Sequence, residues 1–206
     1  MYSDITGFIL SGGKSSRMGE NKSLLKLQGR SIIEITADLM KQIFRQVILI
    51  SNEPGHYGFL NLPVYGDIYP GLGPLAGIHS ALVNSKTTRN FIISCDMPLM
   101  HREVITFLTD YPTKEPITVA RADGFIQQLC GIYDKRCLPA SERLLMAAGG
   151  EISGKKGCRV LEMISLLGAA IIPAEEIPGA SPHAFFNMNR PAEFEFVSRV
   201  FTERAK

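Results

Sequence analysis

The stretch GFILSGGKSSRMGENK, residues 7–22, joins a short apolar run to a segment rich in glycine and lysine. Its first part, Gly7–Leu10, is nearly continuous in apolar residues, which is typical of a strand covered by helices on both faces. Similar runs recur at Val47–Ile50 and Phe91–Ser94, and apolar residues at helical spacing lie between them, as in Ser31–Ile43. This alternation predicts a mostly parallel sheet with helices on both sides.

The same alternation continues through the rest of the chain. Helices are expected at Leu75–Val83, Arg102–Leu108, Leu138–Ala147, Val160–Leu167 and Pro191–Arg204, and strands at Ile117–Ala120, Gln128–Tyr133 and Ala169–Ile172. Gly149–Gly157 contains four glycines and is expected to be a loop, since the pattern resumes after it. We therefore predict one three-layer α/β domain spanning residues 1–206, with its sites at the carboxyl ends of the strands.

The composition is that of an ordinary globular domain, with 206 residues, 45% of them hydrophobic and 20% charged. A net charge of +2 is too balanced for a protein whose main role is to coat nucleic acid or a membrane, so neither partner is expected. The four cysteines form no CxxC pair and lack zinc-ligand spacing, which favours buried thiols in a reducing compartment. With no signal-peptide pattern and no apolar run of roughly 18 residues, a cytoplasmic location is expected.

The segment after the first strand has the chemistry of a phosphate site. It matches neither the Walker pattern nor GxGxxG, yet Gly12 and Gly13 let the backbone approach a ligand and offer its N–H groups. Lys14, Arg17 and Lys22 can direct several cations into one pocket. The alternative is a solvated turn with ordinary surface lysines, and glycines with basic neighbours alone would favour it.

The full string LSGGKSSRMGENK, residues 10–22, resembles the LAGGxSxRMGxDK signature of the molybdenum cofactor guanylyltransferase family, also called the molybdopterin-guanine dinucleotide biosynthesis protein A family. Three further segments resemble the motifs of that family in the same order: GLGPLAG at 71–77, CDMP at 95–98 and FNMNRP at 186–191. The resemblance implies a Rossmann-like three-layer nucleotidyltransferase domain with a mostly parallel sheet. The N-terminal half would bind the nucleotide and the C-terminal half molybdopterin.

The resemblance also implies roles for residues of the N-terminal half. The nucleotide would contact Leu10, Ser11, Gly12, Gly13, Lys22, Asn52, Asp67, Gly73, Gly77 and Asp96, with Arg17, Lys22 and Asp96 as catalytic residues. An aspartate such as Asp67 suits guanine, because one carboxylate can accept from its N1–H and N2 amino groups. Loop capping is the structural alternative for Asn52 and Asp67. Ser11 and Asn21 depart from the alanine and aspartate of the family signature.

The resemblance of CDMP to the metal motif of the family, together with the apolar run that ends at Ser94, makes Asp96 the expected metal ligand; an Asp-x-Pro sequence alone is more often a turn. Mg²⁺ beside a triphosphate needs only one or two carboxylates from the protein. The resemblance assigns Asn187 and Asn189 to the metal or the pterin, and Arg159 to the molybdopterin phosphate. The alternatives are helix capping before a first-turn proline for the asparagines and a solvated loop for the arginine. Arg190 replaces a threonine of the family motif.

The reaction implied by the resemblance transfers GMP from GTP to molybdenum-molybdopterin, with Mg²⁺ as cofactor and pyrophosphate as leaving group. Molybdenum-insertion proteins and molybdoenzyme chaperones are further candidate partners. Two other hypotheses stay open: a related cytidylyl- or sugar-nucleotidyltransferase, and a non-catalytic protein that delivers molybdenum cofactor. The presence of Lys22 and Asp96 favours an enzyme, because a binding protein has less need of a metal ligand.

Overall fold

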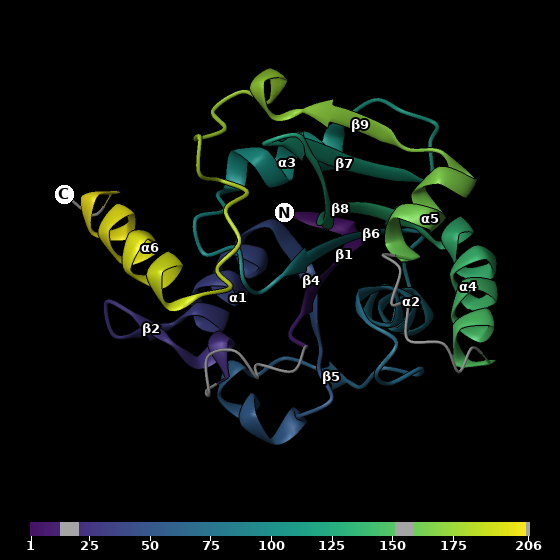
Figure 1. Ribbon diagram of the computed structural model, residues 1–206, viewed down its shortest axis with the longest axis horizontal. Helices are drawn as coiled ribbons and strands as arrows, with labels where there is room; N and C mark the ends of the chain where they lie inside the picture. Colours follow the sequence, from purple (N-terminus) through teal and green to yellow (C-terminus); the bar gives the residue numbers. More distant parts are fainter. Residues whose placement is uncertain (13–20, 151–158, 205–206) are drawn as a thin grey trace.

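The protein is built around one seven-stranded sheet, seen in a computed structural model that describes residues 1–12, 21–150 and 159–204 (Figure 1). The strand order is β5-β4-β1-β6-β8-β7-β9. The strands are β1 (Tyr2–Leu10), β4 (Phe44–Ile50), β5 (Val64–Tyr65), β6 (Arg89–Ser94), β7 (Ile117–Ala122), β8 (Phe125–Asp134) and β9 (Ala170–Pro173). The helices are α1 (Ile32–Ile43), α2 (Pro74–Asn84), α3 (Arg102–Asp110), α4 (Leu138–Gly150), α5 (Arg159–Leu167) and α6 (Pro191–Arg204).

Most strand pairs are parallel, as the sequence predicts. β1 pairs in parallel with both β4 and β6, and the pairs β4–β5 and β7–β9 are also parallel. β8 runs antiparallel to its two neighbours, β6 and β7. The sheet is therefore mostly parallel and carries one reversed strand among those described.

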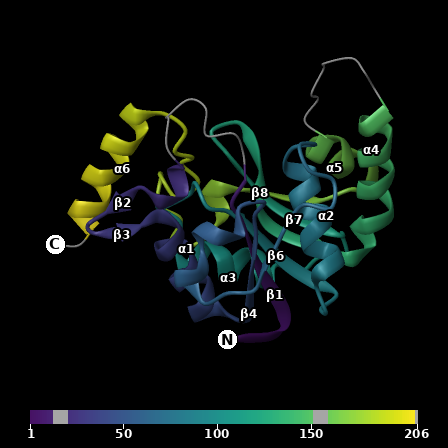
Figure 2. The ribbon, with the colours of Figure 1, turned by 90° about the horizontal axis from the view of Figure 1, so that it is seen from below.

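Helices cover both faces of the sheet, which gives three layers (Figure 2). α1 and α3 pack on one face, against alternate residues of β1 such as Ile5 and Ile9. α2, α4 and α5 pack on the other face, where Phe8 and Leu10 of the same strand point. This two-sided burial explains why the apolar run of β1 is nearly continuous.

The first helix is fixed by its own sequence. Ser31 caps α1 by accepting from the backbone N–H of Glu34, and the Glu34 carboxylate accepts from the Ser31 backbone in return. Ile33, Ala37 and Met40 then recur at helical spacing and are fully buried against the sheet.

The C-terminal segment returns across the molecule to the first half of the chain. Val197 of α6 and Met188 before it form a small apolar cluster with Leu27, Ile32 and Leu99. Leu27 belongs to a small two-stranded sheet of β2 (Lys26–Leu27) and β3 (Arg30–Ser31), beside which α6 lies (Figure 1). This packing brings residues 187–189 next to segments that are far away in sequence.

The elements expected from sequence are present, with a few differences. The short strands β2, β3 and β5 are additions. α4 extends to Gly150, so Gly149 and Gly150, predicted as the start of a loop, are helical. The rest of the predicted loop, residues 151–157, lies outside the described residues. Within the part of the chain that the structure describes, no helix is both long and apolar enough to cross a bilayer.

Substitution of Gly131 in β8 tests the antiparallel pairing of this strand with β7. A Cβ at Gly131 would lie 2.2 Å from the carbonyl oxygen of Thr118 and 2.8 Å from Cγ1 of Val119 on β7. We expect Gly131→Ala to lower the free energy of unfolding by ~3 kcal/mol, because backbone atoms would have to move. Urea denaturation measures the loss. Gly149→Ala is the control, since no described atom lies within 4 Å of its added Cβ and alanine favours helix. Equal midpoints for the two variants would contradict this strand pairing.

Candidate functional site

The candidate site lies at the carboxyl edge of the three adjacent parallel strands β4, β1 and β6. Leu10 at the end of β1 is in register with Ile50 of β4 and Ser94 of β6. The next residues continue the pairing: the Ser11 N–H donates to the carbonyl of Ile50 at 2.9 Å, and the Cys95 N–H donates to that of Leu10 at 3.1 Å. The segments that follow these strands therefore start side by side, where open α/β sheets bind ligands.

Three predicted site residues from distant parts of the sequence meet at this edge. The Lys22 ammonium, on the 3-10 turn Lys22–Leu24, donates to Oδ1 of Asn189 at 3.1 Å. The backbone N–H of Met188 donates to the carbonyl of Asp96 at 2.9 Å. Burial raises the pKa of the Asp96 carboxyl, and the positive charge of Lys22 partly opposes that rise. The C-terminal segment thus closes a site that begins after β1 and β6.

One oxygen of the Asp96 carboxylate, Oδ1, is buried without a hydrogen bond from the described residues. Burial raises the pKa of Asp96 above its ordinary value, the Ser94 side chain and the Lys22 charge oppose that rise, and the Glu193 carboxylate adds to it. Such an oxygen is suited to a cation, because a buried acceptor left alone costs free energy.

The residues present fit a magnesium ion that is bound mainly by substrate. The described part of the chain contains no cluster of three or more His, Cys, Asp or Glu side chains, so it offers no complete protein cage. Mg²⁺ commonly takes one or two carboxylates and completes its shell with phosphate oxygens and water. The orphaned oxygen of Asp96 matches that requirement for one carboxylate.

The predicted base-binding residues form a second cluster beside β1. Nδ2 of Asn52 donates to Oδ2 of Asp67 at 2.9 Å, and the Asp67 N–H donates to Oδ1 of Asn52 at 2.8 Å. Burial raises the pKa of Asp67, while its bond to Asn52 opposes the rise. A Cβ on Gly77 would lie 3.3 Å from Leu10 and 3.7 Å from Asp67, so the backbone of α2 approaches both side chains closely. Gly73 precedes α2 with a φ of 82°, a conformation that favours glycine.

Glu193 caps α6, the role that the sequence analysis gives as the alternative for Asn187 and Asn189. Its carboxylate accepts from the backbone N–H groups of Asn189 and of Arg190, the latter at 2.8 Å, and so caps the start of α6. The amide oxygen of Asn189 is left to Lys22. Nδ2 of Asn187 donates to the carbonyl of Phe185 at 3.3 Å, within its own loop. The side chain of Arg190 has no role in these bonds.

Arg159 lies on a different pair of helices. It is the first residue of α5, and its Nη1 donates to the carbonyl of Leu144 in α4 at 3.1 Å. This bond ties the two helices together, and a substrate role for Arg159 stays a prediction. Gly13 and Arg17, predicted for the nucleotide, lie outside the described residues. Gly12 is described and exposed at the end of the first strand.

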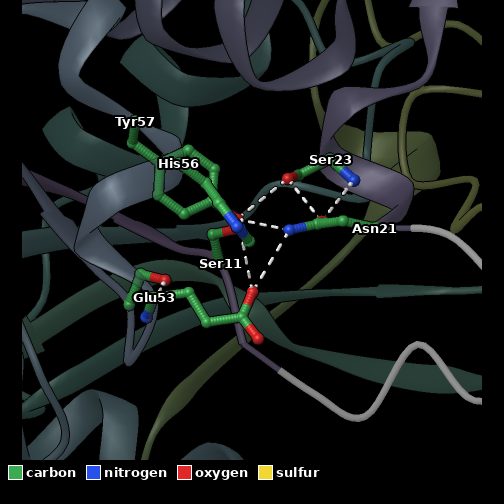
Figure 3. Close-up of polar contacts among 7 residues, drawn as sticks. Ser11, Asn21, Ser23, Glu53, His56 and Tyr57 are labelled. Carbon is green, nitrogen blue, oxygen red and sulfur yellow. Dashed lines mark hydrogen bonds and ion pairs between the residues drawn. The ribbon is translucent and has the colours of Figure 1, made fainter.

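Sequence reasoning missed a polar network beside Lys22 (Figure 3). The buried hydroxyl of Tyr57 lies 2.9 Å from Oγ of Ser11, 3.0 Å from Nδ2 of Asn21 and 3.0 Å from Oγ of Ser23. Nδ2 of Asn21 is also 3.5 Å from Oε2 of Glu53. Tyr57 follows a proline- and glycine-containing stretch without a motif, so no signal in the sequence points to it.

Ser11 of this network lies beside the segment that carries Asp96, because the Cys95 N–H donates to the carbonyl of Leu10 at 3.1 Å. Burial, with a smaller contribution from Asp96, raises the pKa of the Cys95 thiol to about 12. The thiol therefore stays protonated and suits a structural role.

Comparison with known proteins supports the motif resemblance. The sequence model of the MobA-like NTP transferase domain matches residues 7–161. The chain belongs to this family. A protein of Carboxydothermus hydrogenoformans named "probable molybdenum cofactor guanylyltransferase" is 36% identical over 201 residues, covering 97% of this chain and 98% of that protein. A protein of the same name from Clostridium perfringens is 35% identical, covering 91% of this chain and 92% of that protein.

A solved structure shows the same fold. The molybdopterin-guanine dinucleotide biosynthesis protein A from Archaeoglobus fulgidus superposes with a TM-score of 0.80, at 20% identity, covering 96% of this chain and 99% of that chain. The three-layer, mostly parallel α/β architecture predicted from sequence is therefore confirmed.

The buried carboxylate of Asp96 makes a testable contribution to stability. Because its folded pKa is raised, the ionised form destabilises the fold above that pKa, and the penalty disappears as pH falls toward the unfolded value of about 4. Asp96→Asn should therefore raise the free energy of unfolding by ~1 kcal/mol at neutral pH, with no gain below about pH 4. Denaturant titrations across this pH range measure the difference. Asp4→Asn, at an exposed position of β1, is the control, and a gain of the same size in both variants would contradict the assignment.

Proposed function

We propose that this protein transfers GMP from GTP to molybdenum-molybdopterin, forming the molybdopterin guanine dinucleotide cofactor and pyrophosphate. The single observation that carries the proposal is the meeting of Lys22, Asn189 and the unpaired oxygen of Asp96 at the carboxyl edge of the sheet. The names of relatives that match over nearly the full chain support the choice of substrates.

The reaction needs relief of charge repulsion more than it needs a base. A phosphate oxygen of molybdopterin attacks the α-phosphorus of GTP, the bond from that phosphorus to the bridging oxygen breaks, and pyrophosphate leaves with the electron pair. The phosphate monoester is already anionic at neutral pH, so no strong general base is required. Lys22 would stabilise negative charge on the triphosphate, and its bond to Asn189 holds the ammonium at the edge of the sheet.

Asp96 is the residue that would hold Mg²⁺. When bound, the ion supplies positive charge that reduces the repulsion between the two anionic substrates. The protein contributes one carboxylate oxygen in a buried setting, which favours a cation there even before substrate arrives. Arg17 is proposed to add a second cation to the triphosphate.

Asp67 would select guanine. Its Oδ2 accepts from Asn52, which fixes the carboxylate in one orientation and leaves Oδ1 on the side of Gly77. A fixed carboxylate can accept from the N1–H and amino edge of guanine, an edge that adenine lacks. In this proposal Asn52 orients Asp67, and Gly77 makes room for the base.

Molybdopterin would bind on the C-terminal side of the site. Asn187 and Asn189 lie on the segment that returns to Asp96, and Arg159 begins α5, which leads into β9 of the same sheet. Molybdenum-insertion proteins and molybdoenzyme chaperones are proposed to exchange cofactor with this enzyme, in the cytoplasm.

Pyrophosphate release tests the proposal directly. The purified protein is incubated with Mg²⁺ and each of the four nucleoside triphosphates, with and without molybdenum-loaded molybdopterin. We expect release only with GTP and only when both substrates are present. Preference for CTP would favour a cytidylyltransferase, and binding of the pterin without release would favour a delivery protein.

Substitution of Lys22 should affect the rate of this reaction. Lys22→Met keeps a long side chain and removes the charge, so we expect kcat to fall roughly a hundredfold, a loss typical of removing one electrostatic contact to the transition state. Steady-state kinetics measures the fall. Lys26→Met removes an exposed lysine of the neighbouring β2 and should retain wild-type turnover. If the two variants behaved alike, Lys22 would be an ordinary surface residue.

Substitution of Asp67 should affect the choice of base. In Asp67→Asn the amide oxygen still accepts from Asn52, while an NH₂ group faces donors of guanine, so we expect GTP affinity to fall about tenfold with little change for ATP. Calorimetric titration with both nucleotides in the presence of Mg²⁺ measures the ratio. A parallel loss for GTP and ATP would remove Asp67 from base recognition.

A further inference from the structure

Tyr57 connects two segments of the candidate site through one hydroxyl. It lies between the 3-10 turns Pro54–His56 and Gly58–Leu60, and its side chain is 1% exposed. A buried tyrosine usually finds a single partner for its hydroxyl. Here the hydroxyl contacts Ser11, which directly follows β1, and two residues of the segment that carries Lys22 (Figure 3).

The directions of these hydrogen bonds can be assigned. Ser23 Oγ donates to Oδ1 of Asn21 at 2.7 Å, and Nδ2 of Asn21 donates to the oxygen of Tyr57 at 3.0 Å. The Tyr57 proton then goes to Ser23 Oγ, 3.0 Å away, which closes a ring in which each side chain both donates and accepts. The Ser11 hydroxyl is left to donate to Tyr57. The ring needs a donor and an acceptor on one side chain at position 21, which an amide supplies.

Glu53 gives a second reason for a neutral side chain at position 21. Its Oε2 lies 3.5 Å from Nδ2 of Asn21 and 3.2 Å from Nδ1 of His56. An aspartate at position 21 would place a second carboxylate beside this one and would remove the donor to Tyr57. The departures of Ser11 and Asn21 from the family signature therefore meet at the same hydroxyl.

The ring fixes the main chain at Lys22. Asn21 is the N-cap of the turn Lys22–Leu24, and its Oδ1 also accepts from the Ser23 N–H at 3.2 Å. The Lys22 ammonium, bound to Asn189, projects from the start of this turn. Loss of the ring would free that start and so disperse the positions of the ammonium.

We propose that Tyr57 is a positioning residue of the triphosphate site, which holds Lys22 in place through Asn21 and Ser23, and that Glu53 requires the neutral amide at position 21. This inference rests on the proposed function, because it takes the ligand of Lys22 to be the triphosphate of GTP.

Calorimetric titration of the full chain with GTP and Mg²⁺, without pterin, tests the role of Tyr57. We expect Tyr57→Phe to weaken binding about tenfold, and to have little further effect in a Lys22→Met background, since it acts through Lys22. The matched control is Tyr111→Phe, at the residue that follows α3, and this variant should bind GTP like the wild type. Unchanged affinity in Tyr57→Phe, or an equal loss in both backgrounds, would overturn the proposal. Ser23→Ala opens the ring with a smaller change and replaces Tyr57→Phe if that variant does not fold.

A second cycle tests the role of charge at position 21. Asn21→Asp should weaken GTP binding about tenfold in the wild-type background and about threefold or less in Glu53→Gln, where the facing carboxylate is gone. The midpoints of urea unfolding, measured without nucleotide, should show the same coupling. Equal losses in both backgrounds would overturn the role of Glu53.

The two proposals can fail separately. No GTP binding by the wild-type protein would overturn the proposed function and with it the triphosphate role of Tyr57. Tight binding by the wild type that Tyr57→Phe retains would overturn the role of Tyr57 alone.

Discussion

The parallel pairing of β1 between β4 and β6 is the constraint on which the site depends. Leu10 is in register with Ile50 and Ser94, so the strands β1, β4 and β6 end at the same level of the sheet. The segments that follow these strands are therefore neighbours. Apolar side chains on both faces of β1 fix this register, since a slip by one residue would exchange its two buried faces. The position of Asp96 is thus a consequence of core packing.

The sheet alone does not complete the site. Lys22 and Asp96 lie on segments that follow different strands, and the C-terminal segment links them, through Met188 to the Asp96 backbone and through Asn189 to the Lys22 ammonium. Burial of Met188 and Val197 in the cluster below α6 holds that segment in place. Apolar packing directly beside the polar groups therefore decides whether they meet.

The central strands, the helices and the position of Asp96 could be predicted because each depends on a local pattern. A strand buried on both faces is continuous in apolar residues, and a polar residue directly after it must lie at the carboxyl edge. The reversed direction of β8 and the two-residue strand β5 depend on which strands pair, and a period of two does not encode direction. Tyr57 could not be predicted either, because its contacts join residues that are distant in sequence: its three partners are 34 to 46 residues away.

Polar groups at this edge are of two kinds: side chains that are hydrogen bonded to one another, and a carboxylate oxygen that has no partner among the described residues. Tyr57, Asn21, Ser23 and Ser11 satisfy one another, so this network is complete without a ligand and can keep one geometry in the free protein. Asp96 keeps a buried oxygen without a partner among the described residues, which costs stability while the carboxylate is ionised and without a ligand. A preorganised site needs both kinds of group. The hydrogen-bonded network holds the surrounding residues in one geometry, and the unpaired carboxylate oxygen is available to a ligand in that geometry. Ser11 belongs to the first kind, and the carbonyl of Leu10 just before it accepts from the N–H of Cys95, the neighbour of Asp96, so the satisfied network begins directly beside the segment that carries the unpaired carboxylate oxygen.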